Sequence, residues 1–430
     1  MITRAAPALA PAEAARRAAA APGAFWISTP AADEVSIARD VVGAAPAHVV
    51  RGGDVAALEA AWTEARAAWS ATGEAPRSGV PVAAGWLSYD LGRAWAGLPP
   101  RVDASAQPLA PLELGFHDAV WVRPVGGAAT IFARDDAAAR RLLATLERPA
   151  PAAPSTLGPL ASEHDARVYL DGARRVLEYL RAGDAYQVNL ARRLSAPFEG
   201  EAVELAAALR ARAPAPHAAF LSSSDGGAWL VGNSPERFLA LDGAGGVETR
   251  PIKGTLPTGA ARAALLASAK DRAEHVMIVD LERNDLGRVC ETGSVVVEGV
   301  ARVLELPTVL HLVSTVRGRL RADVGLAALL AATFPGGSIT GAPKRRAMQI
   351  IDELEPFARG PYTGATGWLG AAGDLDLAVA IRTALVSGPA NARRLSLCVG
   401  GGIVIDSTAE SELAETEAKS AAFASLAALR

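Results

Sequence analysis

The segment DLDLAVAIRTALV, residues 374–386, is followed after a short connection by RLSLCVGGGIVID, residues 394–406. Both runs are rich in aliphatic residues, which is typical of half-buried or buried strands. A helix is predicted directly afterwards, from about Thr408 to Ala428. Hairpin-like strands and batches of helices recur along the chain. This arrangement favours an α+β fold with antiparallel sheets over a doubly wound parallel one.

A stretch rich in proline and alanine lies upstream, ERPAPAAPSTLGPL at residues 147–160, and it predicts a linker or a sheet-edge crossing. It separates an N-terminal region, residues 1–150, from a larger region, residues 164–430. We expect the two regions to form one compact body. Helical spacing is clear over residues 54–70 and 163–184.

The chain has 430 residues and is nearly neutral, with 43 Lys and Arg against 46 Asp and Glu and a formal net charge of −3. This balance argues against a nucleic-acid-binding protein that relies on a basic surface. No apolar run approaches the roughly 18 residues of a membrane-spanning helix, and prolines and charges interrupt the region where a signal peptide would lie. Cys290 and Cys398 lie far apart, so neither a disulfide framework nor a structural zinc site is expected. We expect a cytoplasmic protein without nucleic-acid or membrane partners.

Only four lysines occur, Lys253, Lys270, Lys344 and Lys419, so the other 39 of the 43 basic residues are arginines. A guanidinium stays charged, whereas a desolvated ammonium can lose its proton and act as a base or nucleophile. The lysines are therefore candidates for a chemical role, and ordinary solvated side chains are the alternative.

Paired carboxylates occur on two predicted helices. Glu412, Glu415 and Lys419 stand at i, i+3 and i+7 of the C-terminal helix and share one face. Asp271 and Glu274 form a second pair, three residues apart. Such carboxylates suit Mg²⁺, which takes oxygen ligands and bridges to anionic substrates. A solvated face with ion pairs is the alternative interpretation.

Three further features suggest a site for a small anion. In FPGGSITGAPK, residues 334–344, the N–H groups of Gly341 and Ala342 are expected at the positive end of the following helix. The glycines at 400–402 would allow a ligand to approach the backbone closely. Arg382 is a charge inside an apolar strand, and a substrate carboxylate would be a good bidentate partner for it. These features together predict a small, multiply anionic ligand held with Mg²⁺.

Eight motifs, in this order and spacing, resemble those of the chorismate-utilising enzymes. They are PIKGT (251–255), EHVMIVDLERNDLG (274–287), LHLVST (310–315), FPGGSITGAPK (334–344), GATGWLG (364–370), AIRTAL (380–385), GGGIVIDS (400–407) and ESELAETEAK (410–419). The resemblance is strong from Asp165 to Ala428 and weak before it, through GWLSYDLG (85–92). It implies an anthranilate synthase component I-like fold, in which two large, mainly antiparallel sheets pack as a sandwich with helices on the outside.

Two positions separate the members of this family. Members that add water to chorismate carry a lysine where this chain has Gln187, so the resemblance implies an ammonia-using member. PIKGT places Lys253 where anthranilate synthases typically have alanine and many aminodeoxychorismate synthases have a nucleophilic lysine. The resemblance therefore implies Mg²⁺-dependent amination of chorismate to 4-amino-4-deoxychorismate, an amino-group transfer for para-aminobenzoate and folate synthesis. Anthranilate synthase component I, which forms anthranilate and pyruvate, is the alternative, with Lys253 as a tolerated variant.

The resemblance also assigns roles to residues. Lys253 would be the nucleophile and Glu236, in NSPERF, the general acid, with a structural carboxylate as the alternative for Glu236. Mg²⁺ would be held by Glu274 and Glu415, with Glu412 and Asp271 as outer or hydrogen-bonding ligands. The implied substrate-binding residues are Gly254, Thr255, His311, Thr340, Gly341, Tyr362, Arg382, Gly400, Gly401, Gly402 and Lys419. Ammonia would come from a separate glutamine amidotransferase subunit, because no cysteine of this chain lies in a glycine-rich nucleophile turn.

Overall fold

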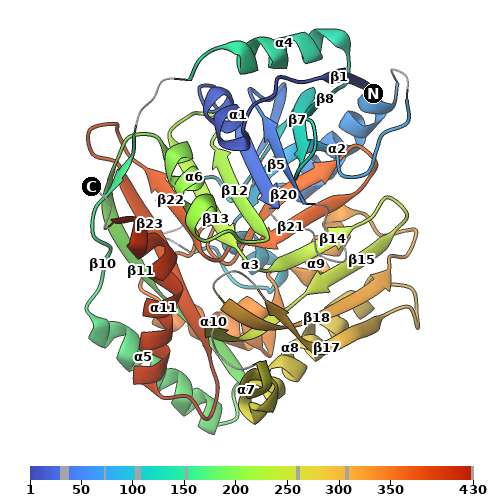
Figure 1. Ribbon diagram of the computed structural model, residues 1–430. Coiled ribbons are helices and arrows are strands. Elements are labelled where there is room, and N and C mark those ends of the chain that lie inside the picture. The colour runs from blue at the N-terminus through green and yellow to red at the C-terminus, as the bar shows by residue number, and fades with distance from the viewer. Residues whose placement is uncertain are drawn as a thin grey trace.

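The computed structural model describes residues 1–29, 38–71, 74–101, 108–150, 154–257, 262–305 and 309–427, but not the side chains of residues 255–257, 264, 269–271 and 309. Two large sheets dominate the fold, and every strand pairing in the described residues is antiparallel. The predicted α+β class with two mainly antiparallel sheets is therefore confirmed (Figure 1).

The first sheet has 13 strands. They are β1 (Ile2–Ala5), β2 (Phe25–Thr29), β3 (Arg39–Gly43), β7 (Ala119–Pro124), β8 (Thr130–Ala133), β9 (Thr156–Leu157), β10 (Ala161–Ser162), β11 (Gln187–Glu199), β12 (His217–Ser222), β13 (Ala228–Ser234), β19 (Gly341–Ala342), β22 (Thr383–Ser387) and β23 (Arg394–Ile403). Their order is β1-β8-β7-β3-β2-β12-β13-β22-β23-β11-β10, and β9 and β19 also pair with β11.

The second sheet has 10 strands. They are β4 (His48–Gly52), β5 (Pro81–Leu87), β6 (Leu112–Phe116), β14 (Arg237–Leu241), β15 (Gly246–Arg250), β16 (Ile252–Pro257), β17 (Val296–Glu305), β18 (Val309–Arg319), β20 (Ala365–Gly370) and β21 (Leu375–Val379). Their order is β16-β18-β15-β14-β21-β20-β5-β6-β4, with β17 paired to β18. Strands of the N-terminal region thus lie in both sheets beside strands of the C-terminal region.

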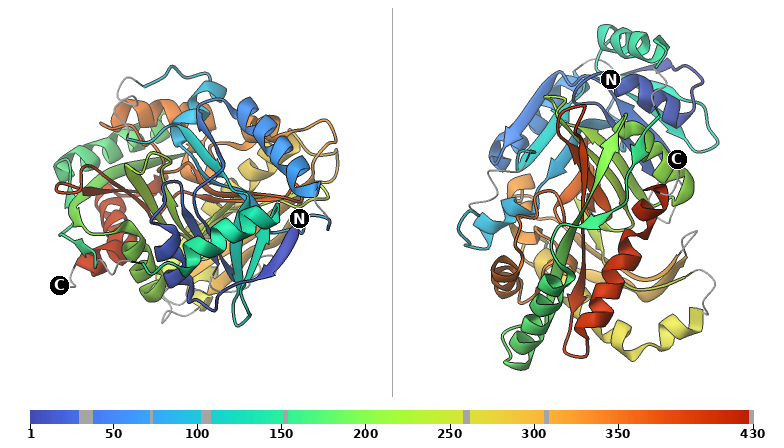
Figure 2. Two further views of the ribbon diagram at one scale, coloured as in Figure 1. Left: turned by 90° about the horizontal axis from the view of Figure 1, so that it is seen from above. Right: turned by 90° about the vertical axis from the view of Figure 1, so that its left-hand side faces the viewer.

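The helices flank this pair of sheets. They are α1 (Pro11–Ala18), α2 (Val55–Ser70), α3 (Gly92–Trp95), α4 (Asp136–Glu147), α5 (Ala166–Arg181), α6 (Ala202–Arg212), α7 (Arg262–Ala267), α8 (Ala269–Gly287), α9 (Leu326–Thr333), α10 (Lys344–Leu354) and α11 (Ala409–Ala427). Helices α1 and α4 lie at one end of the molecule and α7 at the other (Figure 1). Helices α5 and α11 run side by side, which the right-hand view of Figure 2 also shows.

The largest apolar core lies between the two sheets. Phe25, Val41 and Leu221 of the first sheet belong to the same buried cluster as Trp86 and Leu377 of the second. A second cluster joins the other face of the first sheet to α1, α4, α6 and α11, and a third joins β11 to α5 and α10. Burial of this kind contributes about 25 cal/mol per Å² of apolar surface, so the sandwich is the main source of stability.

The segment at residues 374–386 is not the single strand that its apolar pattern predicted. It forms β21 in the second sheet and then β22 in the first, with a break at Ala380–Arg382. Arg382 has a φ of +48°, a left-handed conformation that ends the strand ladder there. The prediction failed because both strands are buried, and a buried crossing between sheets keeps the apolar pattern of one long strand.

A second crossing lies beside the first. The chain leaves the first sheet at the end of β13 and enters the second at β14, and Glu236 lies in the short connection between them. Two backbone hydrogen bonds join the crossings. The Asn233 N–H donates to Arg382 O at 2.9 Å, and the Val379 N–H donates to Glu236 O at 3.0 Å. The fold therefore places Glu236 and Arg382 at the same level, where the two sheets divide.

The helix predictions agree well with the structure, including α2, α5 and α11. The linker predicted at residues 147–160 begins at the end of α4 and includes the short strand β9, which pairs with β11.

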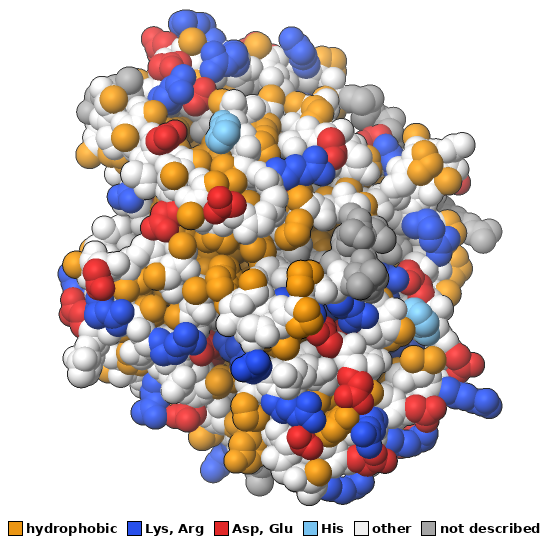
Figure 3. Space-filling model, turned by 180° about the vertical axis from the view of Figure 1, so that it is seen from behind, with side chains coloured by type: hydrophobic (Ala, Val, Ile, Leu, Met, Phe, Trp, Pro, Cys, Tyr) orange, Lys and Arg blue, Asp and Glu red, His pale blue; other side chains and the backbone are white. Residues whose placement is uncertain are grey.

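Charges of both signs are interspersed around a central apolar area on the face shown in Figure 3. None of the helices built from the described residues combines the length and apolarity needed to span a bilayer.

Candidate active site

Lys253 lies on β16 and faces the first sheet. Its Nζ donates to Oε1 of Gln187 on β11 at 3.3 Å. A Cβ added to Gly402 of β23 would lie 3.1 Å from the same Nζ and 2.9 Å from Cδ of Gln187, so the glycine makes room for both side chains. Burial lowers the pKa of Lys253, and Lys419 lowers it further, while Glu274, Glu236 and Glu415 act in the opposite direction. A buried amine with a lowered pKa has the properties of a nucleophile.

The backbone beside Lys253 is irregular. The β16–β18 register shifts between Lys253 and Thr255, and the intervening Gly254 has a φ of +63° that favours glycine. Nδ1 of His311 on β18 lies 3.1 Å from the Gly254 carbonyl oxygen. Burial lowers the pKa of His311 to about 4, so the imidazole is neutral at physiological pH and can donate to that carbonyl.

Glu236 is buried near the same amine. Burial raises its pKa to about 7, and Lys253 and Lys419 are among the groups that oppose this shift. The Ser338 hydroxyl donates to Glu236 Oε1 at 2.7 Å and also favours the carboxylate. A carboxyl group with a pKa near neutrality can donate a proton and recover it, as a general acid requires.

The carboxylates of α11 lie over β23. A Cβ on Gly401 would be 2.7 Å from Glu412 Oε2 and 3.4 Å from Glu415 Oε1, so both carboxylates converge on one backbone position. Ser407 Oγ donates to Glu412 Oε1 at 2.6 Å. Lys419 pairs with Glu415 at 2.6 Å and donates to the Gly400 carbonyl at 2.8 Å.

The donor set suits Mg²⁺, which commonly takes one or two protein carboxylates together with waters and substrate oxygens. Glu274 on α8 and Glu415 on α11 both act electrostatically on Lys253, so the two helices each bring a carboxylate toward the same amine. Among the described residues, no group of three ligating side chains already has the spacing to hold an ion. The side chains of Asp271 and Thr255, both predicted site residues, lie outside the described part of the structure.

Tyr362 borders the site near Gly400, and Arg382 acts electrostatically on His311 and is itself influenced by Glu236. The Arg382 guanidinium is half-buried and has no hydrogen bond or ion pair within the described residues. Its partial burial lowers its pKa, and Glu236 acts in the opposite direction. Burial raises the pKa of the Tyr362 phenol, whose oxygen would lie 2.9 Å from a Cβ on Gly400. An unpaired, half-buried guanidinium is available to bind an anion.

The turn before α10, where an anion site was predicted, lies against β11. Gly341 and Ala342 form β19 and pair with Val188 and Gln187 of β11, which ties the turn to the sheet. The Thr340 hydroxyl donates to the Gly336 carbonyl at 2.9 Å. Residue 341 has to be glycine, because a Cβ there would lie 2.1 Å from the Gln187 carbonyl oxygen.

Lys344, one of the four lysines that were candidates for a chemical role, is held in an ion pair. Lys344 pairs with Asp285 at 2.7 Å and donates to the Thr333 carbonyl. These two contacts connect α10 to α8 and α9 and use the ammonium group within the protein. On the same helix as Asp285, Asp280 and Arg283 form an exposed ion pair.

Sequence reasoning missed a buried ion pair that supports the site. Arg359 pairs with Glu355 at 2.7 Å, and it also donates to the carbonyls of Asn189 and Ile339. Glu355 in turn accepts from the Ala191 N–H at 2.9 Å. The pair thereby fixes β11 against the turn that carries Ser338. The i, i+4 spacing was a weak signal for the pair, because exposed helix pairs share it.

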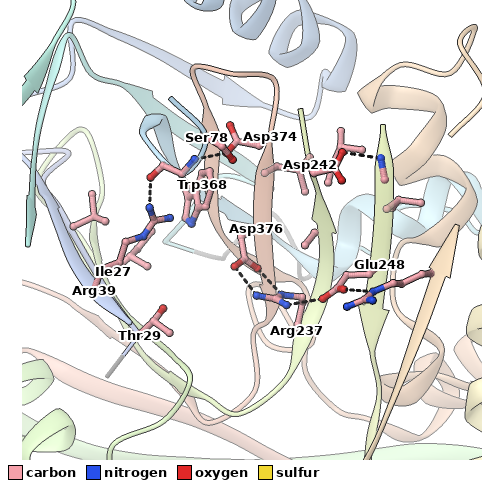
Figure 4. A pocket seen from close by; sticks show the side chains of 18 of the residues that line it. Ile27, Thr29, Arg39, Ser78, Arg237, Asp242, Glu248, Trp368, Asp374 and Asp376 are labelled. Carbon is pink, nitrogen blue, oxygen red and sulfur yellow. Dashed lines mark hydrogen bonds and ion pairs between the residues drawn. The ribbon is translucent and has the colours of Figure 1, made fainter. Parts of the chain in front are cut away.

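A separate cavity of about 300 Å³ opens between the sheets, as Figure 4 shows. Its polar groups are largely paired with one another. Arg237 donates to Asp376 at 3.0 Å and to Glu248 at 2.6 Å, and the Arg39 guanidinium lies over the Trp368 ring at 5.3 Å. Arg237 directly follows Glu236 in the chain, so the same strand end serves both the cavity and the candidate active site.

Comparisons with known proteins identify the family of the chain. The model of the family described as chorismate binding enzyme matches residues 23–425. An aminodeoxychorismate synthase component 1 from Klebsiella aerogenes is 44% identical over 345 residues, which cover 78% of this chain and 74% of the relative. An anthranilate synthase component 1 from Haloarcula marismortui is 40% identical over 365 residues, covering 78% and 73%. The crystal structure of anthranilate synthase component I from Streptococcus pneumoniae matches with a TM-score of 0.77 at 28% identity, over 92% of this chain and 93% of that chain.

Proposed function

Because the chain belongs to the chorismate-binding enzymes, we propose that it aminates chorismate at C4 to give 4-amino-4-deoxychorismate. The observation that carries this proposal is the buried Lys253 amine beside Gln187. A neutral amide cannot serve as the base that activates water, and a desolvated amine is a competent nucleophile. The similarity to an aminodeoxychorismate synthase component 1 supports the same choice.

The reaction proceeds in two displacement steps. The neutral Lys253 amine forms a bond to ring C2 while the C4–O bond breaks, and Glu236 gives its proton to the departing hydroxyl, which leaves as water. Ammonia then forms a bond to C4 while the C2–N bond to lysine breaks, and the Glu236 carboxylate takes the proton that the new amine releases. The enolpyruvyl group is kept. The balance is chorismate plus ammonia to 4-amino-4-deoxychorismate plus water.

The remaining groups bind the substrate. Arg382 pairs with a substrate carboxylate, and Tyr362 and the 400–402 backbone contact its other polar groups. Glu274 and Glu415 would hold Mg²⁺, with Glu412 and Asp271 as outer or hydrogen-bonding ligands. When bound, the ion would neutralise the ring carboxylate. Ammonia would be supplied by a separate glutamine amidotransferase subunit, in keeping with the designation component 1 of the relatives.

Product analysis tests the proposal. The purified chain is incubated with chorismate, Mg²⁺ and ammonium, and aminodeoxychorismate is measured by chromatography while pyruvate is measured with lactate dehydrogenase. Aminated product without pyruvate is expected. A Lys253→Ala variant should lose this activity, while Lys419→Met, which removes a neighbouring cation and no nucleophile, should keep the same product. A Lys253→Ala variant that works at the wild-type rate in low ammonium would exclude the covalent route.

Anthranilate synthase activity is the second candidate. The 40% identity to the Haloarcula marismortui protein and the match to the Streptococcus pneumoniae structure favour it. Fluorescent anthranilate with one equivalent of pyruvate in the same assay would establish it and reject the amination proposal.

A further inference from the structure

A second buried carboxyl group lies behind Glu236. Glu282 is on α8, only 4% of it is exposed, and its Oε1 accepts from the Gly337 N–H at 3.0 Å. Gly337 begins a single 3₁₀ turn, Gly337–Ile339, in the segment between α9 and α10. A Cβ on Gly337 would lie 2.4 Å from Leu281 Cδ2, so the turn rests directly on α8.

The same turn reaches the candidate general acid. Ser338 follows Gly337, and its hydroxyl donates to Glu236 Oε1 at 2.7 Å. Glu282 is therefore connected to Glu236 through two consecutive residues, the first held by its backbone N–H and the second acting by its side chain. A backbone N–H that is buried against a helix needs an acceptor, and Glu282 supplies it from outside the turn.

Burial favours the protonated form of Glu282. Together with the negative charges of Asp285 and Glu236, it raises the pKa of Glu282 well above its ordinary value, and Lys344 acts in the opposite direction. Lys344 pairs with Asp285 at 2.7 Å, which leaves Glu282 without a full counter-ion of its own among these groups. A neutral carboxyl group can hold the turn by its oxygen without placing a second negative charge beside Glu236.

We propose that Glu282 is a positioning residue for the general acid, and that it acts by holding the Gly337 N–H so that the Ser338 hydroxyl stays on Glu236. The role rests on the proposed function, in which Glu236 protonates the departing hydroxyl. Glu282 does not contact the substrate. Its removal should therefore change proton transfer, measured as kcat and its pH dependence, and leave the KM for chorismate nearly unchanged.

Four variants of the full chain test this connection, with Asp280→Asn as the control. Asp280 is exposed on the same helix, so its replacement should leave kcat unchanged. Glu282→Gln keeps an oxygen that can accept from the Gly337 N–H, so kcat should stay within about threefold. Glu282→Leu and Ser338→Ala should each lower kcat about 10- to 100-fold, part of the 10²- to 10⁴-fold that a general acid contributes. The kcat of the double variant Glu282→Leu/Ser338→Ala should equal that of the less active single variant, because both changes break the same connection.

A titration provides a readout that does not depend on turnover. The Ser338 hydrogen bond favours the Glu236 carboxylate, so losing it raises the pKa of Glu236. Carboxyl ¹³C NMR of glutamate-labelled protein, with the resonance assigned by Glu236→Gln, should show this upward shift in both Glu282→Leu and Ser338→Ala. If the wild-type chain fails to aminate chorismate, the proposed function is wrong, while the titration still judges the positioning role.

Several results would overturn the positioning role. They are a wild-type kcat in folded Glu282→Leu, multiplicative losses in the double variant, or a change confined to KM. Where Glu282→Leu does not fold, as thermal unfolding would show, Glu282→Gln decides: a loss as large as that of Ser338→Ala means that the ionisable group and not the accepting oxygen matters.

Discussion

Substitution of Gly402 by alanine should impair catalysis without weakening the fold. The new Cβ would lie 2.9 Å from Gln187 Cδ, 3.0 Å from Gln187 Nε2 and 3.1 Å from Lys253 Nζ, whereas ordinary contacts begin at 3.4 Å. The two side chains must therefore retreat by about 0.3 to 0.5 Å. A misplacement of about 1 Å can cost about 10²-fold in rate, so a proportional displacement of the nucleophile should lower kcat about 4- to 10-fold.

Stability should move in the opposite direction. The φ of Gly402 lies outside the left-handed region, so alanine is compatible with the strand. Replacing glycine at such a position stabilises a fold by about 0.4–1 kcal/mol, because the unfolded chain loses freedom. Gly400→Ala is the matched control. Its Cβ would lie 2.5 Å from the Leu190 carbonyl oxygen and 2.9 Å from Ala191 Cα, which are backbone atoms of the paired strand. It should cost about 1–3 kcal/mol.

Steady-state kinetics with saturating ammonium and thermal unfolding of both variants separate these effects. Gly402→Ala should show reduced kcat at an unchanged or raised Tm, and Gly400→Ala a lowered Tm. A Gly402→Ala enzyme with the wild-type kcat would refute the placement of Lys253 and Gln187 against this glycine, or the catalytic role of the amine.

Three further predictions follow from buried charges. Arg359→Leu leaves the buried Glu355 carboxylate without its partner and should lower the free energy of unfolding, measured with denaturant, by about 3–5 kcal/mol. The double variant Arg359→Leu/Glu355→Leu should recover most of this loss. Equal losses in the single and double variants would contradict the pairing. Glu236 titrates near pH 7 in the fold and near 4.5 when unfolded, so its ionisation destabilises the fold progressively from pH 4.5 to 7, by about 3 kcal/mol. The free energy of unfolding of Glu236→Gln, relative to that of the wild type, should therefore be higher by about that amount at pH 8 than at pH 4.5. Parallel pH–stability curves of the two proteins would contradict this prediction. Arg382→Met should lower kcat/KM for chorismate about 10- to 100-fold, because hydrogen bonds to charged groups contribute about 1.5–3 kcal/mol. An unchanged kcat/KM would refute the proposed contact between Arg382 and the substrate.

The sequence indicated the chemistry of the site better than its shape. The i, i+3 spacing of Glu412 and Glu415 was sufficient to place both carboxylates on one face of α11, because a helix has a fixed period. The scarcity of lysine singled out four residues. Lys253 and Lys419 lie in the candidate site, Lys344 is held in an ion pair outside it, and the side chain of Lys270 lies outside the described part of the structure. Spacing alone could not separate them, because an ion pair such as that of Lys344 with Asp285 depends on how α10 meets α8.

Contacts between distant segments had no local signal. Ser338 and Glu236 are 102 residues apart, and Arg359 and Asn189 are 170 apart. Neither pair follows from periodicity, which reports only which face of an element is apolar. The sheet crossing at Arg382 was missed for a related reason. Its flanking strands are buried in different sheets, and burial on both sides removes the alternation that would have marked two strands.

The two crossings place a buried carboxyl group and a half-buried guanidinium at the same level of the fold. A chain that passes from one sheet to the other interrupts both ladders, so side chains at the crossing project into the division between the sheets. Glu236 and Arg382 occupy adjacent crossings that are held together by the hydrogen bonds at Asn233 and Val379. Their mutual attraction is felt without direct contact, since Glu236 raises the pKa of Arg382 against the effect of burial. An anionic substrate that bound Arg382 would remove this stabilisation of the carboxylate and favour protonated Glu236. Substrate binding would thereby prepare the acid for the proton transfer that follows.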